Sequence, residues 1–128
     1  MVEEDNITDK LEAVLKKLLS NNREIILAII TSMEGLPITS ILPRGYNETR
    51  LSAMIATLLS LSERTVIDME IGIFKQIFVK GLDGYLLIFD AEIAVLAVST
   101  TEKAKLGLVI LECERASHEI SKILKREK

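Results

Sequence analysis

The only cysteine and the only histidine in the chain, Cys113 and His118, are residue types that could act as a nucleophile and its base. They lie five residues apart in a segment whose pattern predicts a helix, so their side chains should point about 140° apart. Cys113 falls on the apolar stripe of that helix, which predicts a buried small hydrophobic residue. His118 lies off the stripe, with Glu114 one turn away. The spacing therefore argues against a Cys–His pair.

Other chemistry finds no better support in the residue pattern. The carboxylates Glu63, Asp68 and Glu70 have no fixed spacing that would pair them for acid–base work. The chain has no GxxxxGK[ST] phosphate-binding loop, and Gly81–Gly84 (GLDG) is better explained as a hairpin turn. One histidine cannot form a histidine cluster for a metal. We predict no catalytic residues, no cofactor and no metal, and hence a protein that is not an enzyme.

The length, charge and composition of the chain limit its possible functions. With 128 residues the chain predicts one domain, residues 1–128, and its formal charge of −3 argues against nucleic-acid binding by bulk positive charge. The single cysteine excludes an internal disulfide. No apolar run reaches the roughly 18 to 20 residues of a membrane span. The N-terminus is acidic and polar, unlike a signal peptide. We expect a cytoplasmic protein without a membrane span.

The elements predicted along the chain follow the order α-β-β-α-β-β-β-α. The first helix should begin at a cap, Asn6 or Thr8, and end near Ser20; Asn47 should cap the middle helix, which runs to about Met69. A capping box, Ser99–Glu102, predicts the start of a last helix that ends near Lys125. The predicted strands are 23–33, 36–42, 73–80, 85–90 and 93–99. This order predicts an α/β sandwich, with one five-stranded antiparallel sheet covered by helices on both faces.

The middle helix carries more apolar residues than one sheet face requires. The sheet-facing line should be Leu51, Ile55, Leu58, Ser62 and Val66. Met54, Leu59 and Leu61 flank that line and would need another partner. Strand 73–80 should be a sheet edge, and Pro37 should place strand 36–42 at the other edge. A second copy of the chain would cover both the helix and the edge strand. The predicted dimer interface is Met54, Leu58, Leu61, Lys75, Ile77 and Val79.

Four segments together resemble the roadblock family, also called the dynein light chain roadblock family. They are GLPITSILPRG, LSAMIATLLSLSER, VKGLDGYLLIFDAEIAVLAVST and AKLGLVILECERAS, and the resemblance extends from about Glu24 to Ile123. It implies a profilin-like fold whose members pair through the middle helix and the neighbouring edge strand. It also implies that a single-domain prokaryotic or archaeal member binds and regulates a Ras-like small GTPase. The alternative implied role is a scaffold subunit that pairs with another roadblock protein in a larger motor or signalling complex.

One line of polar or small residues lies roughly opposite the sheet-facing side of the middle helix. Its members recur at steps of three and four: Arg50, Ala53, Thr57, Ser60 and Arg64. In a twofold dimer two such lines would form a shallow platform with arginines at its ends, and we expect the GTPase to dock there. The alternative is a solvated polar stripe that only keeps the helix soluble. The sequence does not separate a homodimer from a heterodimer.

Overall fold

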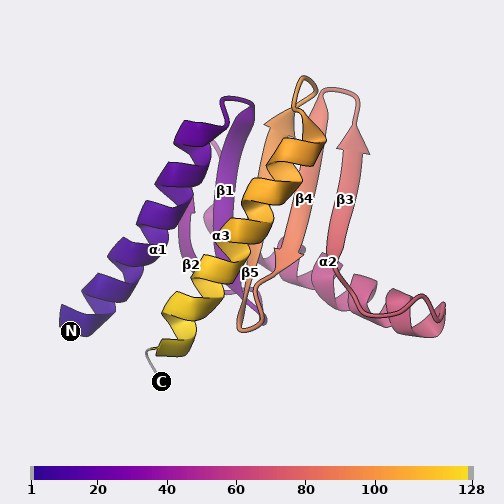
Figure 1. Ribbon diagram of the computed structural model, residues 1–128, viewed down its shortest axis with the longest axis horizontal. Helices are drawn as coiled ribbons and strands as arrows, with labels where there is room; N and C mark the ends of the chain where they lie inside the picture. The colour runs from indigo at the N-terminus through magenta and orange to yellow at the C-terminus, as the bar shows by residue number, and fades with distance from the viewer. Residues whose placement is uncertain (1, 127–128) are drawn as a thin grey trace.

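The computed structural model describes residues 2–126, and the element order is the predicted one (Figure 1). The elements are α1 (Val2–Asn21), β1 (Ile25–Ser32), β2 (Pro37–Ile41), α2 (Glu48–Asp68), β3 (Gln76–Gly81), β4 (Gly84–Asp90), β5 (Ala94–Thr101) and α3 (Leu106–Arg126). None of these helices is long and apolar enough to cross a membrane.

The five strands form one sheet in the order β2-β1-β5-β4-β3, and every neighbouring pair is antiparallel. Strands β2 and β3 are therefore the two edges, as the sequence predicts. Pro37 opens β2, where its missing N–H costs the sheet little because the outer side of an edge strand is unpaired. β1 and β5 lie inside the sheet, which explains why both of their faces are apolar.

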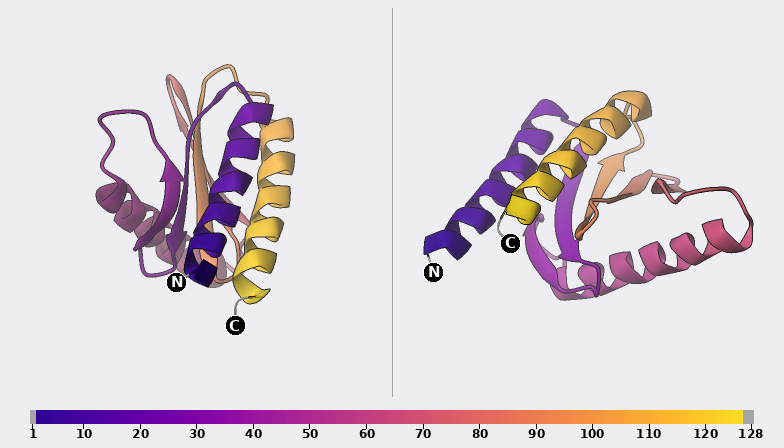
Figure 2. Two further views of the ribbon diagram at one scale, coloured as in Figure 1. Left: turned by 90° about the vertical axis from the view of Figure 1, so that its left-hand side faces the viewer. Right: turned by 60° about the horizontal axis from the view of Figure 1, so that its bottom comes forward.

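Helices cover both faces of the sheet, with α1 and α3 side by side on one face and α2 alone on the other (Figure 2). Alternation along β1 supplies the two cores. Ala28 and Ile30 pack in the cluster that includes α1 and α3, whereas Leu27 and Ile29 pack in the cluster that includes α2. The α/β sandwich predicted from the sequence is confirmed.

Two predicted helix starts are wrong. Helix α1 begins at Val2, so Asn6 and Thr8 lie inside it and cap nothing. The residues before Asn6 include Glu3 and Glu4, which are good helix formers and allow the helix to start earlier. Ser99–Thr101 is not a capping box but the end of β5, and α3 begins only at Leu106.

The middle helix does begin as predicted. The Asn47 side chain accepts a hydrogen bond of 3.0 Å from the backbone N–H of Arg50, and its backbone is extended as an N-cap requires. Gly35, in the turn between β1 and β2, has a φ of +94° and packs against the start of α2. A Cβ added there would lie 3.2 Å from the Cα of Ala53 and from the Cβ of Ala56. This turn and the cap fix where α2 enters the structure.

Candidate interaction surface

The inner face of α2 is displaced slightly from the predicted line. Its buried residues are Ser52, Ile55, Ala56 and Leu59, while Leu51, Leu58, Ser62 and Val66 are half-buried. Leu59 is 1% exposed and packs with Leu27, Ile29 and Ile88, so the prediction that it needs a second partner is wrong. At about 100° per residue, Leu59 lies only about 40° from Ile55 around the helix, well within reach of the sheet.

The opposite face of α2 presents the predicted polar line to solvent. Arg50, Ala53, Thr57, Ser60 and Arg64 are all exposed. The Thr57 hydroxyl donates a 2.9 Å hydrogen bond to the Ala53 carbonyl, so its proton is used within the helix. Neither arginine forms an ion pair with any residue whose side chain is described. The guanidinium groups at the two ends of the line are available to a partner.

Met54 and Leu61, predicted to lie in a dimer interface, are 50% and 62% exposed. Leu58, also predicted there, is half-buried and packs against the inner cluster. Leu61 lines a shallow hollow together with Lys75 and Ile77, so this flank of α2 faces the β3 edge. The structure thus brings the helix and strand parts of the predicted interface next to each other.

The β3 edge is shorter than predicted. The strand begins at Gln76 rather than Ile73, so Lys75 precedes it and is exposed in the connecting segment. Ile77 faces the α2 side of the sheet and is half-buried, and Val79 is 43% exposed. Within the sheet, β3 pairs with β4 alone. Its outer side can accept another strand.

The C-terminal end of α2 projects beyond the sheet (Figures 1 and 2). A helix of 21 residues is about 31 Å long, whereas four spacings between five strands measure about 19 Å. Because α2 crosses the strands, it extends past β3. We call residues 67–73 the α2 overhang. Its large apolar side chains are the most exposed of the helix and its connection: Ile67 71%, Met69 68%, Ile71 66% and Ile73 90%.

The backbone holds the α2 overhang in a defined direction. The N–H of Ile71 donates to the Val66 carbonyl at 3.2 Å, and the N–H of Glu70 donates to the Ile67 carbonyl at 3.1 Å. These two bonds form a Schellman motif, in which Glu70 takes the left-handed position with a φ of 56°. Sequence reasoning missed the overhang, although four large apolar residues in a segment predicted to end a helix were a usable signal.

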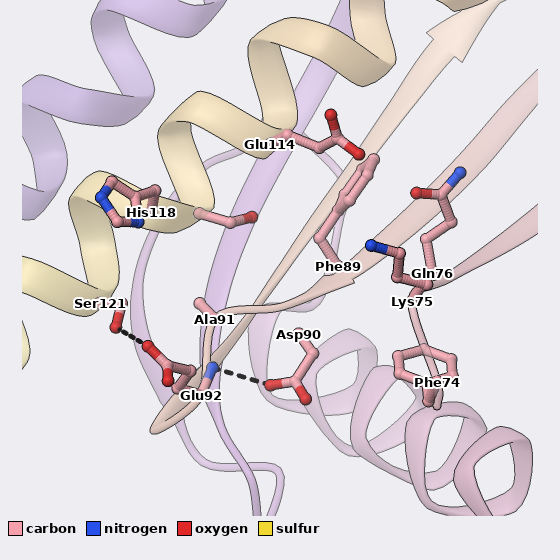
Figure 3. A pocket seen from close by; sticks show the side chains of 11 residues that line it. Phe74, Lys75, Gln76, Phe89, Asp90, Ala91, Glu92, Glu114, His118 and Ser121 are labelled. Atoms are coloured by element: carbon pink, nitrogen blue, oxygen red, sulfur yellow. Dashed lines mark hydrogen bonds between the residues drawn. The ribbon is translucent and has the colours of Figure 1, made fainter. Parts of the chain in front are cut away.

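A cleft on the α3 side of the sheet is lined by polar and charged side chains (Figure 3). It measures about 290 Å³ and is lined by residues that include Lys75, Asp90, Glu92, Glu114 and His118. Glu92 has a φ of 72° and accepts hydrogen bonds from Lys125 Nζ at 2.7 Å and from the Ser121 hydroxyl at 2.5 Å. Those two bonds lower the pKa of the Glu92 carboxyl. Its carboxylate thus ties the β4–β5 turn to α3.

Cys113 does not join this cleft. It is fully buried in the core of α1 and α3, and burial raises the pKa of its thiol to about 12. It is therefore a protonated core residue at neutral pH and not a nucleophile. His118 is exposed on the same helix. Across the part of the chain that the structure describes, no group of three or more His, Cys, Asp or Glu side chains is placed to hold a metal ion.

The carboxylates considered for acid–base chemistry lie far along α2. Glu63 is half-buried, and Asp68 and Glu70 are exposed at the end of the helix. None of the hollows described above or below brings these three carboxylates together as a reactive pair. What the structure does assemble is a surface of α2, the α2 overhang and the β3 edge.

The model of the Roadblock/LC7 domain family matches residues 11–100, and the chain belongs to that family. It is 30% identical over 93 residues to the uncharacterized protein MJ1340 of Methanocaldococcus jannaschii, a match that covers 73% of this chain and 82% of the relative.

Solved structures of gliding protein MglB have a similar fold. The Myxococcus xanthus protein has a TM-score of 0.86 at 22% identity, covering 93% of this chain and 90% of that one. The Thermus thermophilus protein has a TM-score of 0.85 at 20% identity, covering 94% and 92%. These likenesses establish the roadblock fold over most of the chain.

Proposed function

We propose that the protein forms a homodimer through α2 and the edge of β3. The support is the solvent exposure of Met54 and Leu61, the apolar α2 overhang and the edge strand that pairs on one side only. A twofold axis beside β3 would pair the two edge strands and continue the sheet from one copy into the other. The projecting end of each α2 would then cover the sheet of the other copy. One contact would bury all three features.

The dimer acts as a non-enzymatic binding module that binds and regulates a Ras-like small GTPase in the cytoplasm. The observation that carries this proposal is the exposed line on α2, with short side chains between Arg50 and Arg64, in a chain of the Roadblock/LC7 family. Short side chains let another protein approach the helix closely. Arginine is enriched at the energetic centres of protein interfaces. The GTPase would lie across the paired lines of the two copies.

Regulation without catalysis fits the chemistry of the chain. Cys113 is buried and protonated, and the sequence lacks a phosphate-binding loop. Isothermal calorimetry with the purified protein should therefore detect no binding of GTP or GDP. Tight nucleotide binding by this chain alone would overturn the proposal.

The partner can be sought by capture from an extract of the native cell on immobilised protein, with GDP in one sample and a non-hydrolysable GTP analogue in another. We expect a small GTPase that is retained in a nucleotide-dependent way. Its rate of GTP hydrolysis with and without the purified protein then separates a GTPase activator from a protein that only recruits the GTPase. Capture of large assemblies without a small GTPase would contradict the proposal.

The same apolar surface could instead serve a scaffold subunit that pairs with a different roadblock protein in a motor or signalling complex. Light scattering at micromolar concentration distinguishes the two. A stable dimer of the purified chain supports the homodimer. A monomer, or an aggregate that a second roadblock protein from the same cell converts into a defined complex, supports the scaffold.

A further inference from the structure

Helices α1 and α3 form a groove on the face of the molecule opposite α2. Two hollows of about 100 and 330 Å³ lie between these helices and share Val14, Lys17 and Glu119, so they form one continuous depression. We call it the α1–α3 groove. Its other lining residues are Lys10, Ala13, Leu18, Asn21, Glu112, Arg115, Ala116, Ile123 and Arg126.

The floor of the groove is apolar and its rims are cationic. Val14, Leu18 and Ala116 are each no more than 6% exposed, and Ile123 is half-buried. Four cationic side chains stand against two carboxylates, although the chain as a whole carries a formal charge of −3. One of those carboxylates, Glu112, already accepts a 2.9 Å hydrogen bond from the Asn22 amide. The net charge of the groove is therefore positive, whereas that of the whole chain is negative.

The central cations of the groove form no ion pair with the side chains that the structure describes. Neither Lys17 on α1 nor Arg115 on α3 forms an ion pair with any side chain described between Asn6 and Arg126. The neighbouring Lys16, by contrast, lies 3.8 Å from Glu12. Charges of one sign that face each other across an apolar floor complement an anionic ligand with an apolar side.

The dimensions match a short helix. Along α3, Arg115 and Arg126 are 11 residues apart, or about 16 Å, which is the length of about three helical turns. Ala13, which is exposed, and Ile123, which is half-buried, give the groove its accessible apolar surface. A concave groove accepts a helix, whereas a flat membrane would meet the helix ridges first. No large apolar residue that lines the groove is exposed to enter a lipid layer, and the exposed Leu108 and Leu111 of α3 lie outside its lining.

We propose that the α1–α3 groove binds an acidic amphipathic helix of a partner protein, with its apolar side on Ala13 and Ile123 and its carboxylates between Lys17 and Arg115. The groove lies on the other face of the sheet from α2, and α3 lies wholly outside residues 11–100 that the family model matches. The site is therefore separate from the GTPase surface. It would let one dimer hold a GTPase on one side and a second partner on the other.

The test uses a fluorescein-labelled peptide of about 12 residues, long enough for about three helical turns, with alanine and leucine on one side and glutamates on both flanks. Binding is followed by fluorescence anisotropy. The groove variant carries Lys17→Glu and Arg115→Glu. The matched control carries Lys16→Glu and Lys122→Glu, which make the same charge change at exposed positions of the same helices outside the groove.

We expect the wild type and the matched control to bind equally and the groove variant to bind about tenfold more weakly, since two surface ion pairs are reversed. A peptide with glutamine in place of glutamate should bind as weakly. In heteronuclear NMR spectra of the wild type, the peptide should shift the amide signals of Ala13, Val14, Ala116 and Ile123. Circular dichroism of both variants checks that they fold, which the exposure of all four residues favours.

Three results would overturn the proposal. One is no binding of the acidic peptide to the wild type; another is equal weakening in both variants, which indicates unspecific charge attraction. The third is groove-dependent sedimentation with phosphatidylcholine–phosphatidylserine vesicles in the absence of peptide binding, which assigns the surface to a membrane. Peptide binding by an Arg50→Ala, Arg64→Ala variant shows whether the groove works independently of the proposed GTPase surface.

Discussion

Helices α1 and α2 are almost equal in length, at 20 and 21 residues, yet they bury their apolar residues very differently. On α1, Leu11, Val14, Leu15 and Leu18 are at most 6% exposed, and the described side chains of that helix include no large exposed apolar residue. On α2 and its overhang, six large apolar side chains are at least 50% exposed: Met54, Leu61, Ile67, Met69, Ile71 and Ile73.

Geometry explains this difference better than composition does. Helix α1 has α3 beside it, so one flank as well as its inner face is covered. Helix α2 is alone on its face and longer than the sheet is wide. A helix in that position can carry apolar residues beyond its sheet-facing side only if something outside the chain covers them. The predictions below test whether α2 has one buried side or two.

The largest effect should separate Leu59 from Leu61, two leucines on the same helix. Leu59→Ala removes a side chain that is 1% exposed and should lower the free energy of unfolding by about 2–5 kcal/mol. Leu61→Ala should leave the unfolding of the single chain almost unchanged and act only on association. Urea unfolding at two protein concentrations measures both effects. Equal losses in the two variants at low concentration would mean that Leu61 belongs to the core of one chain.

A charge at Leu61 should break the proposed dimer. Leu61→Glu would place a carboxylate in an apolar contact and should raise the dissociation constant of the dimer by about 100-fold. Light scattering over a dilution series measures it. Leu82→Glu is the control, because Leu82 is 92% exposed at the tip of the β3–β4 turn and should change nothing. A Leu61→Glu protein that dimerises like the wild type would exclude this flank of α2 from the interface.

Substitutions in the polar line on α2 should have a smaller effect than those in its apolar flank, and they should affect binding of the GTPase rather than dimerisation. Arg50→Ala with Arg64→Ala should weaken GTPase binding by about tenfold, with dimerisation intact. Arg44→Ala, in the exposed loop before α2, is the control. Any loss of stimulated hydrolysis should be recovered at high protein concentration.

Two other outcomes of that experiment are informative. A double variant that binds normally but stimulates nothing would identify an arginine that acts on the transition state, an effect worth about 10³ to 10⁵ in rate. Normal binding with normal hydrolysis would place the docking surface elsewhere and leave the polar line as a solvated stripe.

The sequence predicted what local chemistry determines. The Asn47 cap and the turn at Gly81–Gly84 each depend on neighbouring residues, and both were correctly predicted. The capping box at Ser99–Glu102 failed because strand pairing overrides local preference. Thr100 pairs with Ile25 on one side and with Tyr85 on the other, which keeps it in β5.

The candidate surface was only partly predictable for a related reason. Periodicity shows that Met54 and Leu61 lie away from the centre of the sheet-facing stripe, but it does not show the direction in which α2 crosses the strands. The α2 overhang exists because the helix crosses them and is longer than the sheet is wide. The α1–α3 groove likewise depends on the packing of two helices that are about 100 residues apart in the sequence.

The direction of the α2 overhang should depend on the backbone at Glu70. A left-handed conformation is unfavourable for a residue with a Cβ, so Glu70→Gly should raise the free energy of unfolding by about 1 kcal/mol. Glu63→Gly is the matched opposite, because glycine inside the helix should lower stability by about 1 kcal/mol. Thermal and urea unfolding of both variants measure the two changes in the free energy of unfolding. A loss of stability with Glu70→Gly would contradict the Schellman motif and the orientation that it gives to Ile71 and Ile73.

The smallest effect should come from the other face of the sheet, where Glu92 ties the β4–β5 turn to α3. Hydrogen bonds from Lys125 and Ser121 lower the pKa of the Glu92 carboxyl. A group with a lowered folded-state pKa contributes stability above its unfolded pKa and loses that contribution as the pH falls through the folded value.

Glu92→Gln should therefore be slightly less stable than the wild type at neutral pH, and the difference should shrink as the pH falls below the ordinary glutamate pKa of about 4.3. Urea unfolding between neutral and acid pH measures it, with Glu102→Gln as the exposed control. Because Glu92 is solvent-exposed, 0.5 M salt should reduce the difference as well. A difference that grows in acid would show that the pKa of Glu92 is raised rather than lowered, and the link between the turn and α3 would then have to come from another contact.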